Sequence, residues 1–230
     1  MAALGGRIVF GTEGTYAPFS YHDAATDELT GYDVDVARAV AARLGLEAEF
    51  AETTWDGIFA ALESGRFNAI ANEVEITAER QAKYDLSVAY SVSYPVVIAR
   101  ADDDRFQTVA DLSGRTAAQS PGSNWGAKAE GYGALVETVP GFSESVAAIK
   151  DGRVDFTLND ALAALDYFQA TGDSDVKVAL EITDDKVSQG FALQKDSGLL
   201  PALNQALAQL AADGTLAQLG QKYFGQDISG

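Results

Sequence analysis

Hydrophobic residues along the chain follow two alternating spacings, which predict strands and helices in turn. From Asp33 to Leu44 the apolar residues fall on one face of a helix, and Gly45 ends it. The pattern predicts strands or extended segments over 7–11, 47–52, 92–99, 176–180 and 188–193, of which 92–99 is the most apolar and β-branched. Runs with a period of about 3.6 residues predict further helices over 77–83, 123–129, 161–170 and, as one long helix, 199–219. Strands that alternate with helices are typical of α/β proteins.

An internal repeat organises this pattern. Residues 55–73 align with residues 142–160 position by position and without a gap. Each copy has an aromatic residue, an amphipathic helix, a glycine, a short apolar strand, and then Asn followed by an acid, which is Glu73 in the first copy and Asp160 in the second. Two copies predict two similar lobes. Because ligands of open α/β sheets bind beyond the carboxyl ends of the strands, the repeat predicts a site between the lobes to which both contribute.

The chain is expected to leave the first lobe and return to it. Gly6-Arg7 recurs as Gly114-Arg115, so each lobe has its own start, but the C-terminal helix has no counterpart in the second lobe. The first lobe is therefore predicted to contain two segments and the second lobe one: 1–92 plus 192–230, and 93–191. Two extended crossings, near 90–97 and 187–193, would form a hinge that permits domain closure.

Composition removes several classes of function. The 230 residues carry a net charge of −18, which argues against a nucleic-acid or anionic-membrane surface. Cysteine is absent, the single histidine, His22, lies in a polar segment, and no phosphate loop or calcium loop occurs, so no catalytic triad, metal site or cofactor is predicted. No apolar run approaches the roughly 20 residues of a membrane span. Residues 1–6 lack the basic and apolar regions of an intact signal peptide, so an exported protein would be represented here in its mature form.

The remaining polar groups suit a small zwitterion. Arg80 follows the first repeat copy, and a guanidinium can bind a carboxylate through two charge-assisted hydrogen bonds; a surface arginine is the alternative. Asp160 can accept hydrogen bonds from an α-ammonium or cap the helix that follows it, and one carboxylate can do both. Ser123 and Asn124 begin a helix, where backbone N–H groups favour a carboxylate or the side chains simply cap. Three aromatic residues could wall a pocket or belong to the core: Tyr16, Phe19 and Trp55.

These residues occur within a set of short motifs whose order resembles the extracytoplasmic solute-binding proteins of ABC importers, in the polar amino-acid family. The motifs extend over nearly the whole chain: Gly11 to Tyr21, Leu29 to Ala37 (L-T-G-Y-D-V-D-V-A), Ile76 to Arg80 (I-T-A-E-R), Gly122 to Trp125, Val154 to Ala161, Ala212 to Leu216, and Lys222 to Gly225. The segments around Asn72 and Ser123 are most similar to the cystine-type branch.

The resemblance implies a type II periplasmic-binding-protein-like fold, in which central mixed sheets are flanked by helices and two lobes close on one amino acid. It implies no enzyme activity, delivery of the ligand to an ABC transporter permease, a monomer, and a periplasmic or extracellular location, with lipid anchoring left open. Arg80 would hold the α-carboxylate, Asp160 the α-ammonium, and Tyr16 and Trp55 the side chain. The positions expected at the ligand are Glu13, Tyr16, Phe19, Trp55, Asn72, Glu73, Glu75, Arg80, Gly122, Ser123, Asn124 and Asp160.

One segment departs from the family. Where the cystine-type branch usually reads Asn-Gln-Val-Gly-Ile-Thr, this chain has Asn72-Glu73-Val74-Glu75-Ile76-Thr77. A carboxylate about 4 Å from a ligand carboxylate, at an effective dielectric near 20, would cost on the order of 4 kcal/mol. Glu73 and Glu75 therefore point away, pair with Arg80, or select a different, cationic ligand.

Two other classes stay open at this stage. An enzyme on the same scaffold, such as a cyclohexadienyl or arogenate dehydratase, could use Glu13, Glu73 or Glu75 as a general acid. An extracellular amino-acid sensor domain would share the fold and the ligand class.

Overall fold

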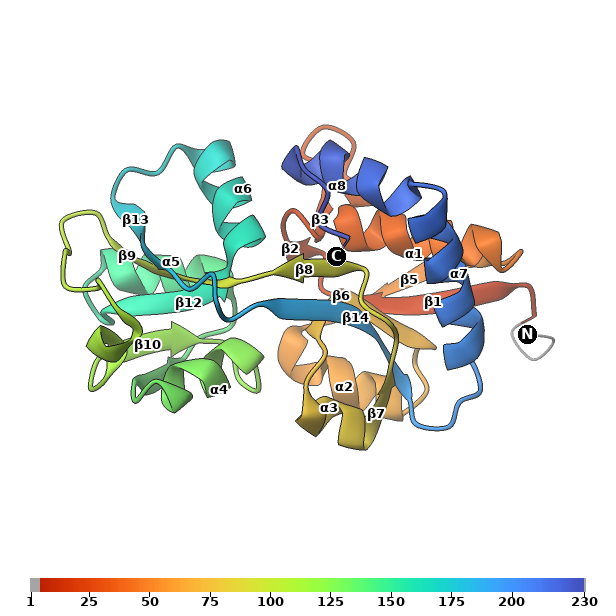
Figure 1. Cartoon of the computed structure of the whole chain (residues 1–230), viewed down its shortest axis with the longest axis horizontal. Helices are drawn as coiled ribbons and strands as arrows, with labels where there is room; N and C mark the ends of the chain where they lie inside the picture. The colour runs from red at the N-terminus through yellow and green to blue at the C-terminus, as the bar shows by residue number, and fades with distance from the viewer. Residues whose placement is uncertain (1–4, 230) are drawn as a thin grey trace. The chain divides into compact units, whose positions relative to one another are not determined.

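The chain, described over residues 5–229 by a computed structural model, alternates strands and helices as the hydrophobic pattern predicts (Figure 1). It divides into two compact units, each with its own sheet. Unit 1 takes the residues up to Val92 and resumes at Ser188, whereas unit 2 spans Ser93–Val187. The sequence placed the return to the first lobe at 192. Residues 1–4, on which the signal-peptide argument partly rests, lie outside the described range.

The sheet of unit 1 has parallel strands at one side and antiparallel strands at the other, in the order β5-β1-β6-β14-β7, with β8 paired to β14. β1 lies between two parallel neighbours, β5 and β6, and β14 runs antiparallel to β6. A small separate sheet, β2-β3-β4, lies between β1 and α1 in the sequence. The bounds are β1 Arg7–Thr12, β2 Thr15–Tyr16, β3 Ser20–His22, β4 Leu29–Thr30, β5 Glu47–Glu52, β6 Ala69–Glu75, β7 Tyr84–Leu86, β8 Ser91–Ser93 and β14 Val187–Gln194.

Helices cover both faces of this sheet. In Figure 1, α1, α7 and α8 lie on one face and α2 and α3 on the other. The inner stripe of α1, from Val36 to Ala41, is buried as its spacing predicts. On the opposite face, Ile58 and Leu62 of α2 pack with Ile70 and Val74 of β6. The bounds are α1 Tyr32–Arg43, α2 Trp55–Glu63, α3 Ala78–Lys83, α7 Leu200–Ala212 and α8 Thr215–Phe224.

Unit 2 repeats the architecture of unit 1. Its sheet has the order β11-β10-β12-β9-β13, in which β10 is again flanked by two parallel strands and β9 runs antiparallel to β12. The bounds are β9 Pro95–Arg100, β10 Thr116–Gln119, β11 Leu135–Thr138, β12 Phe156–Asp160, β13 Val176–Glu181, α4 Asn124–Gly131, α5 Phe142–Lys150, α6 Ala161–Thr171 and a 3₁₀ turn, Val109–Leu112.

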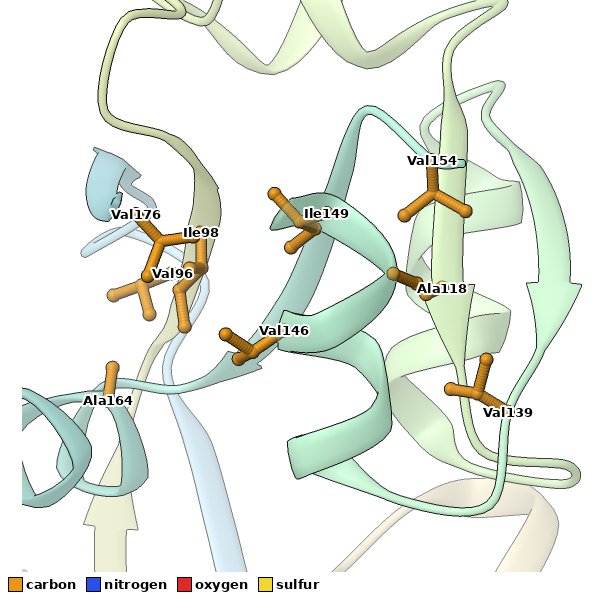
Figure 2. Close-up of a cluster of buried hydrophobic side chains, with 10 residues drawn as sticks. Val96, Ile98, Ala118, Val139, Val146, Ile149, Val154, Ala164 and Val176 are labelled. Atoms are coloured by element: carbon orange, nitrogen blue, oxygen red, sulfur yellow. The ribbon is translucent and has the colours of Figure 1, made fainter. Parts of the chain in front are cut away.

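Two hydrophobic clusters use the two faces of this sheet. Figure 2 shows one of them, in which Val96 and Ile98 of β9 face Val146 and Ile149 of α5. Val97 and Ala99 belong to the second cluster, which includes Ala129 of α4 and Leu158 of β12. Alternate residues of β9 therefore serve opposite cores, as the two-residue period of a strand requires. Because helices cover both faces, β9 is apolar from Pro95 to Ala99.

The sequence repeat corresponds to α2-β6 in unit 1 and α5-β12 in unit 2. The side chain of Asn68 accepts a hydrogen bond from Val9 N (2.8 Å), and that of Asp155, its counterpart, accepts one from Thr116 N (3.0 Å). Each residue fixes the start of its strand against the central strand of its own sheet. Only an acceptor oxygen is needed for this contact, so the repeat tolerates the exchange of Asn for Asp.

The prediction of one long helix over 199–219 is wrong. Gly214 adopts a left-handed conformation, with φ 79°, and separates α7 from α8. The side chain of Asp213 then accepts hydrogen bonds from Thr215 N (3.1 Å) and Thr215 Oγ1 (2.6 Å) at the start of the new helix. The leucine spacing describes the face of α7 correctly but does not register the Asp-Gly-Thr turn.

Candidate functional site

In unit 1 the carboxyl ends of β1 and β6 meet around the side chain of Asn72. Its Oδ1 accepts hydrogen bonds from Thr12 Oγ1 (3.0 Å), Glu13 N (2.8 Å) and Ser20 Oγ (3.3 Å). Its Nδ2 donates to Glu13 Oε2 at 2.7 Å. Asn72 is only 2% exposed. Its role in this unit is therefore to fix the turn after β1 and to orient the Glu13 carboxylate.

Glu13 lies at the N-terminus of α2. Its carboxylate accepts hydrogen bonds from the Asn72 amide and from the backbone N–H of Trp55, the first residue of that helix. Burial raises the pKa of Glu13, while these two hydrogen bonds act in the opposite direction. A helix N-terminus stabilises negative charge, so Glu13 is an oriented acceptor suited to a cationic group.

Glu73 faces the interior of unit 1. Its backbone has φ 48°, a left-handed conformation that is rare for a residue with a long side chain. The backbone N–H donates to Asp33 Oδ2 (2.6 Å), and Oε1 accepts from Ser91 Oγ (3.1 Å). Tyr90 Oη donates to the other Asp33 oxygen at 2.9 Å. Glu73 is thus 8% exposed and belongs to a buried polar network that includes residues of α1 and β8.

Arg80 lies on α3, above the rings of two residues of α2. Its guanidinium carbon is 5.4 Å from the ring centroid of Trp55 and 5.4 Å from that of Phe59. Nη1 donates to the backbone oxygen of Glu75 at 3.1 Å. Burial lowers the pKa of Arg80, and the negative charge of Glu75 partly offsets this effect. Since an arginine stays protonated in proteins, Arg80 presents a half-buried and oriented cation.

The three predicted aromatic residues have different surroundings. Trp55 is partly buried and lies beneath Arg80. Tyr16 packs on Phe19, with ring centroids 5.2 Å apart. Phe19 itself is fully buried, and its other neighbour is Phe224 of α8, at 5.7 Å. Phe19 therefore supports Tyr16 from the core of unit 1.

In unit 2 the predicted residues lie at the starts of two helices. Asp160 is 1% exposed and caps α6, since its Oδ1 accepts from Leu162 N at 2.8 Å. The same oxygen accepts from Ser93 Oγ at 2.7 Å. Ser123 caps α4 by accepting from Gly126 N at 3.1 Å. Gly122, with φ 70°, and Asn124 flank this cap.

Sequence reasoning missed Phe59 and the Asp33–Ser91 network. Phe59 follows Trp55 by one helical turn, and this spacing alone was a signal that both rings share a face. Asp33 stands in the L-T-G-Y-D-V-D motif, but nothing local to the sequence indicates that its side chain reaches the end of β6.

The arrangement provides an oriented cation, oriented carboxylates and aromatic surfaces. Among residues 5–229, no group of three or more His, Asp or Glu side chains could hold a metal ion. Within the same range, no helix has the length and apolar character to cross a membrane. Two α/β units of matching topology, with charged and aromatic groups at the strand ends, define the class of two-lobed solute-binding receptors.

The chain belongs to the bacterial extracellular solute-binding proteins, family 3, whose family model matches residues 8–226. This confirms the resemblance and the fold class. Its role is that of a solute-binding receptor in amino-acid ABC transport.

Three similar proteins illustrate the assignment. The L-cystine-binding protein TcyA of Bacillus subtilis is 46% identical over 97% of this chain and 83% of its own length. A probable amino-acid ABC transporter-binding protein of Haemophilus influenzae is 44% identical over 96% of this chain and 86% of its own length. A solved structure described as an ancestral arginine-binding protein bound to arginine is 32% identical, with a TM-score of 0.88 over 96% of this chain and 100% of its own.

Proposed function

We propose that this chain binds a free amino acid. The observation that carries the proposal is the position of Arg80, whose guanidinium is held over two rings and by the carbonyl of Glu75. A planar guanidinium held in this way is suited to a ligand α-carboxylate. Asp160 would accept hydrogen bonds from the α-ammonium while it caps α6, and Ser123 with Gly122 and Asn124 would offer polar groups at the start of α4.

The side chain of the ligand would contact Tyr16 and Trp55 and reach toward Glu13. An oriented, half-buried carboxylate such as that of Glu13 favours a ligand that carries a second cationic group. Cystine has a second ammonium, and one relative is named as a cystine-binding protein. Arginine has a guanidinium, and a similar solved structure is named as an arginine-binding protein. The proposed order of preference is L-cystine and then L-arginine, because the cystine-binding relative shares the higher identity.

In this proposal Glu73 and Glu75 act differently from one another. At least one Glu73 oxygen is committed to Ser91, so its carboxylate serves the interior of unit 1. Glu75 is 8% exposed; it lends its backbone oxygen to Arg80, and its charge favours the charged form of the guanidinium. Of the three options left open by the sequence, pairing with Arg80 best suits Glu75.

The ligand-loaded protein would be monomeric, would work outside the cytoplasm, and would deliver the amino acid to an ABC transporter permease. The named relatives are binding proteins, and the proposal accordingly includes no turnover.

Isothermal titration with a panel of amino acids, including L-cystine, L-arginine and L-glutamine, tests the proposal. Arg80→Ala removes charge-assisted hydrogen bonds worth about 1.5–3 kcal/mol and is expected to weaken binding by roughly 10-fold to 150-fold. Arg66→Ala is the matched control, since Arg66 is exposed and donates to a backbone oxygen, Glu52 O.

A folded protein that binds no amino acid would contradict the proposal. Equal losses in the Arg80 and Arg66 variants would remove Arg80 from the site. A bound ligand that emerges chemically changed would favour the enzyme instead.

A further inference from the structure

Phe59 connects Arg80 to the core of unit 1. Its ring meets Trp55 edge-on, with centroids 5.6 Å apart and an interplanar angle of 85°. It lies 4.9 Å from the ring of Tyr84 at 37°. The Arg80 guanidinium carbon lies 5.4 Å from its centroid. Phe59 therefore contacts both the Arg80 guanidinium and the ring of Trp55, which also contacts that guanidinium.

The position of Phe59 is itself fixed from behind. Tyr84, in β7, donates from Oη to Glu63 Oε1 at 2.6 Å, and Glu63 is the last residue of α2. Burial and this carboxylate raise the pKa of Tyr84 to about 12, so the hydroxyl remains a donor at neutral pH. Tyr84 is thereby held against the helix that carries Phe59, and the ring has little freedom to tilt.

The hydrogen bonding of the Arg80 guanidinium does not by itself fix the orientation of its plane. Among the described residues, the guanidinium donates one hydrogen bond, from Nη1 to Glu75 O at 3.1 Å. One hydrogen bond permits rotation about its own axis, whereas contacts with two rings inclined at 85° to each other restrict that rotation. The backbone of Arg80 is fixed separately, because its N–H donates to Thr77 Oγ1 at 3.2 Å.

We propose that Phe59 is a positioning residue for ligand binding, and that it acts by holding the Arg80 guanidinium in the plane that receives the ligand carboxylate. This rests on the proposed role of Arg80. Phe59 needs no contact with the ligand. A partly desolvated cation–π contact, together with the orientation that it imposes, corresponds to about 5-fold to 30-fold in affinity.

Three substitutions in the full chain test the proposal, with L-cystine and L-arginine as the probes in isothermal titration. Phe59→Leu keeps apolar volume but removes the ring and is expected to weaken the tighter of the two by about 5-fold to 30-fold. Phe59→Tyr keeps the ring and is expected to stay within about 2-fold of the wild type. Phe50→Leu is the matched control: Arg38 lies 5.5 Å from the Phe50 ring in the same unit, away from the proposed ligand groups.

Arg80→Met separates this proposal from the function on which it rests. If Arg80→Met binds as tightly as the wild type, the proposed function of Arg80 fails. If Arg80→Met binds weakly but Phe59→Leu matches Phe50→Leu, the positioning role is overturned. Where residual binding to Arg80→Met is measurable at millimolar ligand, adding Phe59→Leu should weaken it by less than about 2-fold. The same loss in both backgrounds would mark Phe59 as structural only. Urea unfolding of each variant confirms that it is folded.

Discussion

Asn72→Asp would replace only the side-chain NH₂ group of Asn72, the residue that hydrogen-bonds Thr12, Glu13 and Ser20 in unit 1. The substitution preserves shape but replaces the amide that donates to Glu13 Oε2 at 2.7 Å with a carboxylate oxygen. Two carboxylates would then face one another in a buried setting, since Asn72 is 2% exposed. The three hydrogen bonds accepted by Oδ1 could all persist.

The expected loss of stability combines two effects. A hydrogen bond to a charged acceptor is worth about 1.5–3 kcal/mol. Like charges about 4 Å apart, at an effective dielectric near 20, repel by about 4 kcal/mol, although uptake of a proton by one carboxyl limits this cost. We therefore expect Asn72→Asp to lower the free energy of unfolding by about 3–5 kcal/mol at pH 7.

The effect should depend on pH in a stated direction. Burial already raises the pKa of Glu13 in the folded protein, and a second carboxylate would raise the pKa of the pair further. A raised folded pKa means that the protonated pair is compatible with folding, so the deficit is full at neutral pH. It should shrink as pH falls toward the unfolded value of a carboxyl, near about 4.

Asn68→Asp supplies the matched control. Asn68 stands four positions earlier and uses an acceptor oxygen toward Val9 N, and its counterpart in unit 2 is already an aspartate, Asp155. This variant should stay within about 0.5 kcal/mol of the wild type. Urea unfolding of both variants at several pH values between about 4.5 and about 7 measures this difference in the free energy of unfolding. Equal stability of the two variants, or a deficit that does not change with pH, would refute the reasoning.

Two further predictions concern packing and charge. Gly57→Ala in α2 is expected to raise the free energy of unfolding by about 0.5–1 kcal/mol, because a methyl group there meets nothing closer than 3.6 Å. Gly11→Ala should lower the free energy of unfolding by about 1–3 kcal/mol, because its methyl group would overlap the buried Phe67 ring. Similar thermal midpoints for the two variants would contradict this pair of expectations. The Arg105 guanidinium lowers the pKa of Asp103 to about 2, so this carboxylate stabilises the fold above its unfolded pKa of about 4 and ceases to do so as pH falls to about 2. Asp103→Asn should cost about 1–2 kcal/mol at pH 7, after allowance for the 41% exposure of Arg105, and almost nothing near about pH 2; a urea-unfolding deficit that persists in acid would exclude the charge as its cause.

The sequence predicted the parts of the fold that local periodicity determines. Strand and helix order, the duplicated α2-β6 and α5-β12 units, and the short helix that follows Thr77 agree with spacing and with residue types near each element. The break at Gly214 was missed because the leucine stripe indicates which face is buried, not whether the backbone continues in one helix. A turn of Asp, Gly and Thr was the signal that outweighed it.

Side-chain direction was the part of the candidate site that spacing could not supply. The sequence placed both Glu73 and Glu75 beside the expected ligand position but left the direction of each side chain open. The positive φ of Glu73 turns its backbone N–H toward Asp33 and its carboxylate toward Ser91, contacts that bridge residues far apart in the sequence. Likewise, Phe59 has ordinary helical spacing, and only the placement of α3 gives its ring a cation to hold.

The two acids that end the repeat show how one backbone plan acquires two chemistries. Glu73 accepts from Ser91 within unit 1, and Asp160 accepts from Ser93 within unit 2. Ser91 and Ser93 are alternate residues of β8, where the chain leaves the first unit, so each unit fastens its own repeat to the same short strand. The backbones then differ: Glu73 has φ 48°, whereas Asp160 has φ −66° and caps a helix. A carboxylate that must cap a helix keeps its oxygens near that N-terminus, where a ligand ammonium would also be stabilised by it, while a carboxylate on a left-handed residue is turned toward its own unit. Duplication thus provides matching strand ends, and the conformation of the final residue determines where its carboxylate lies.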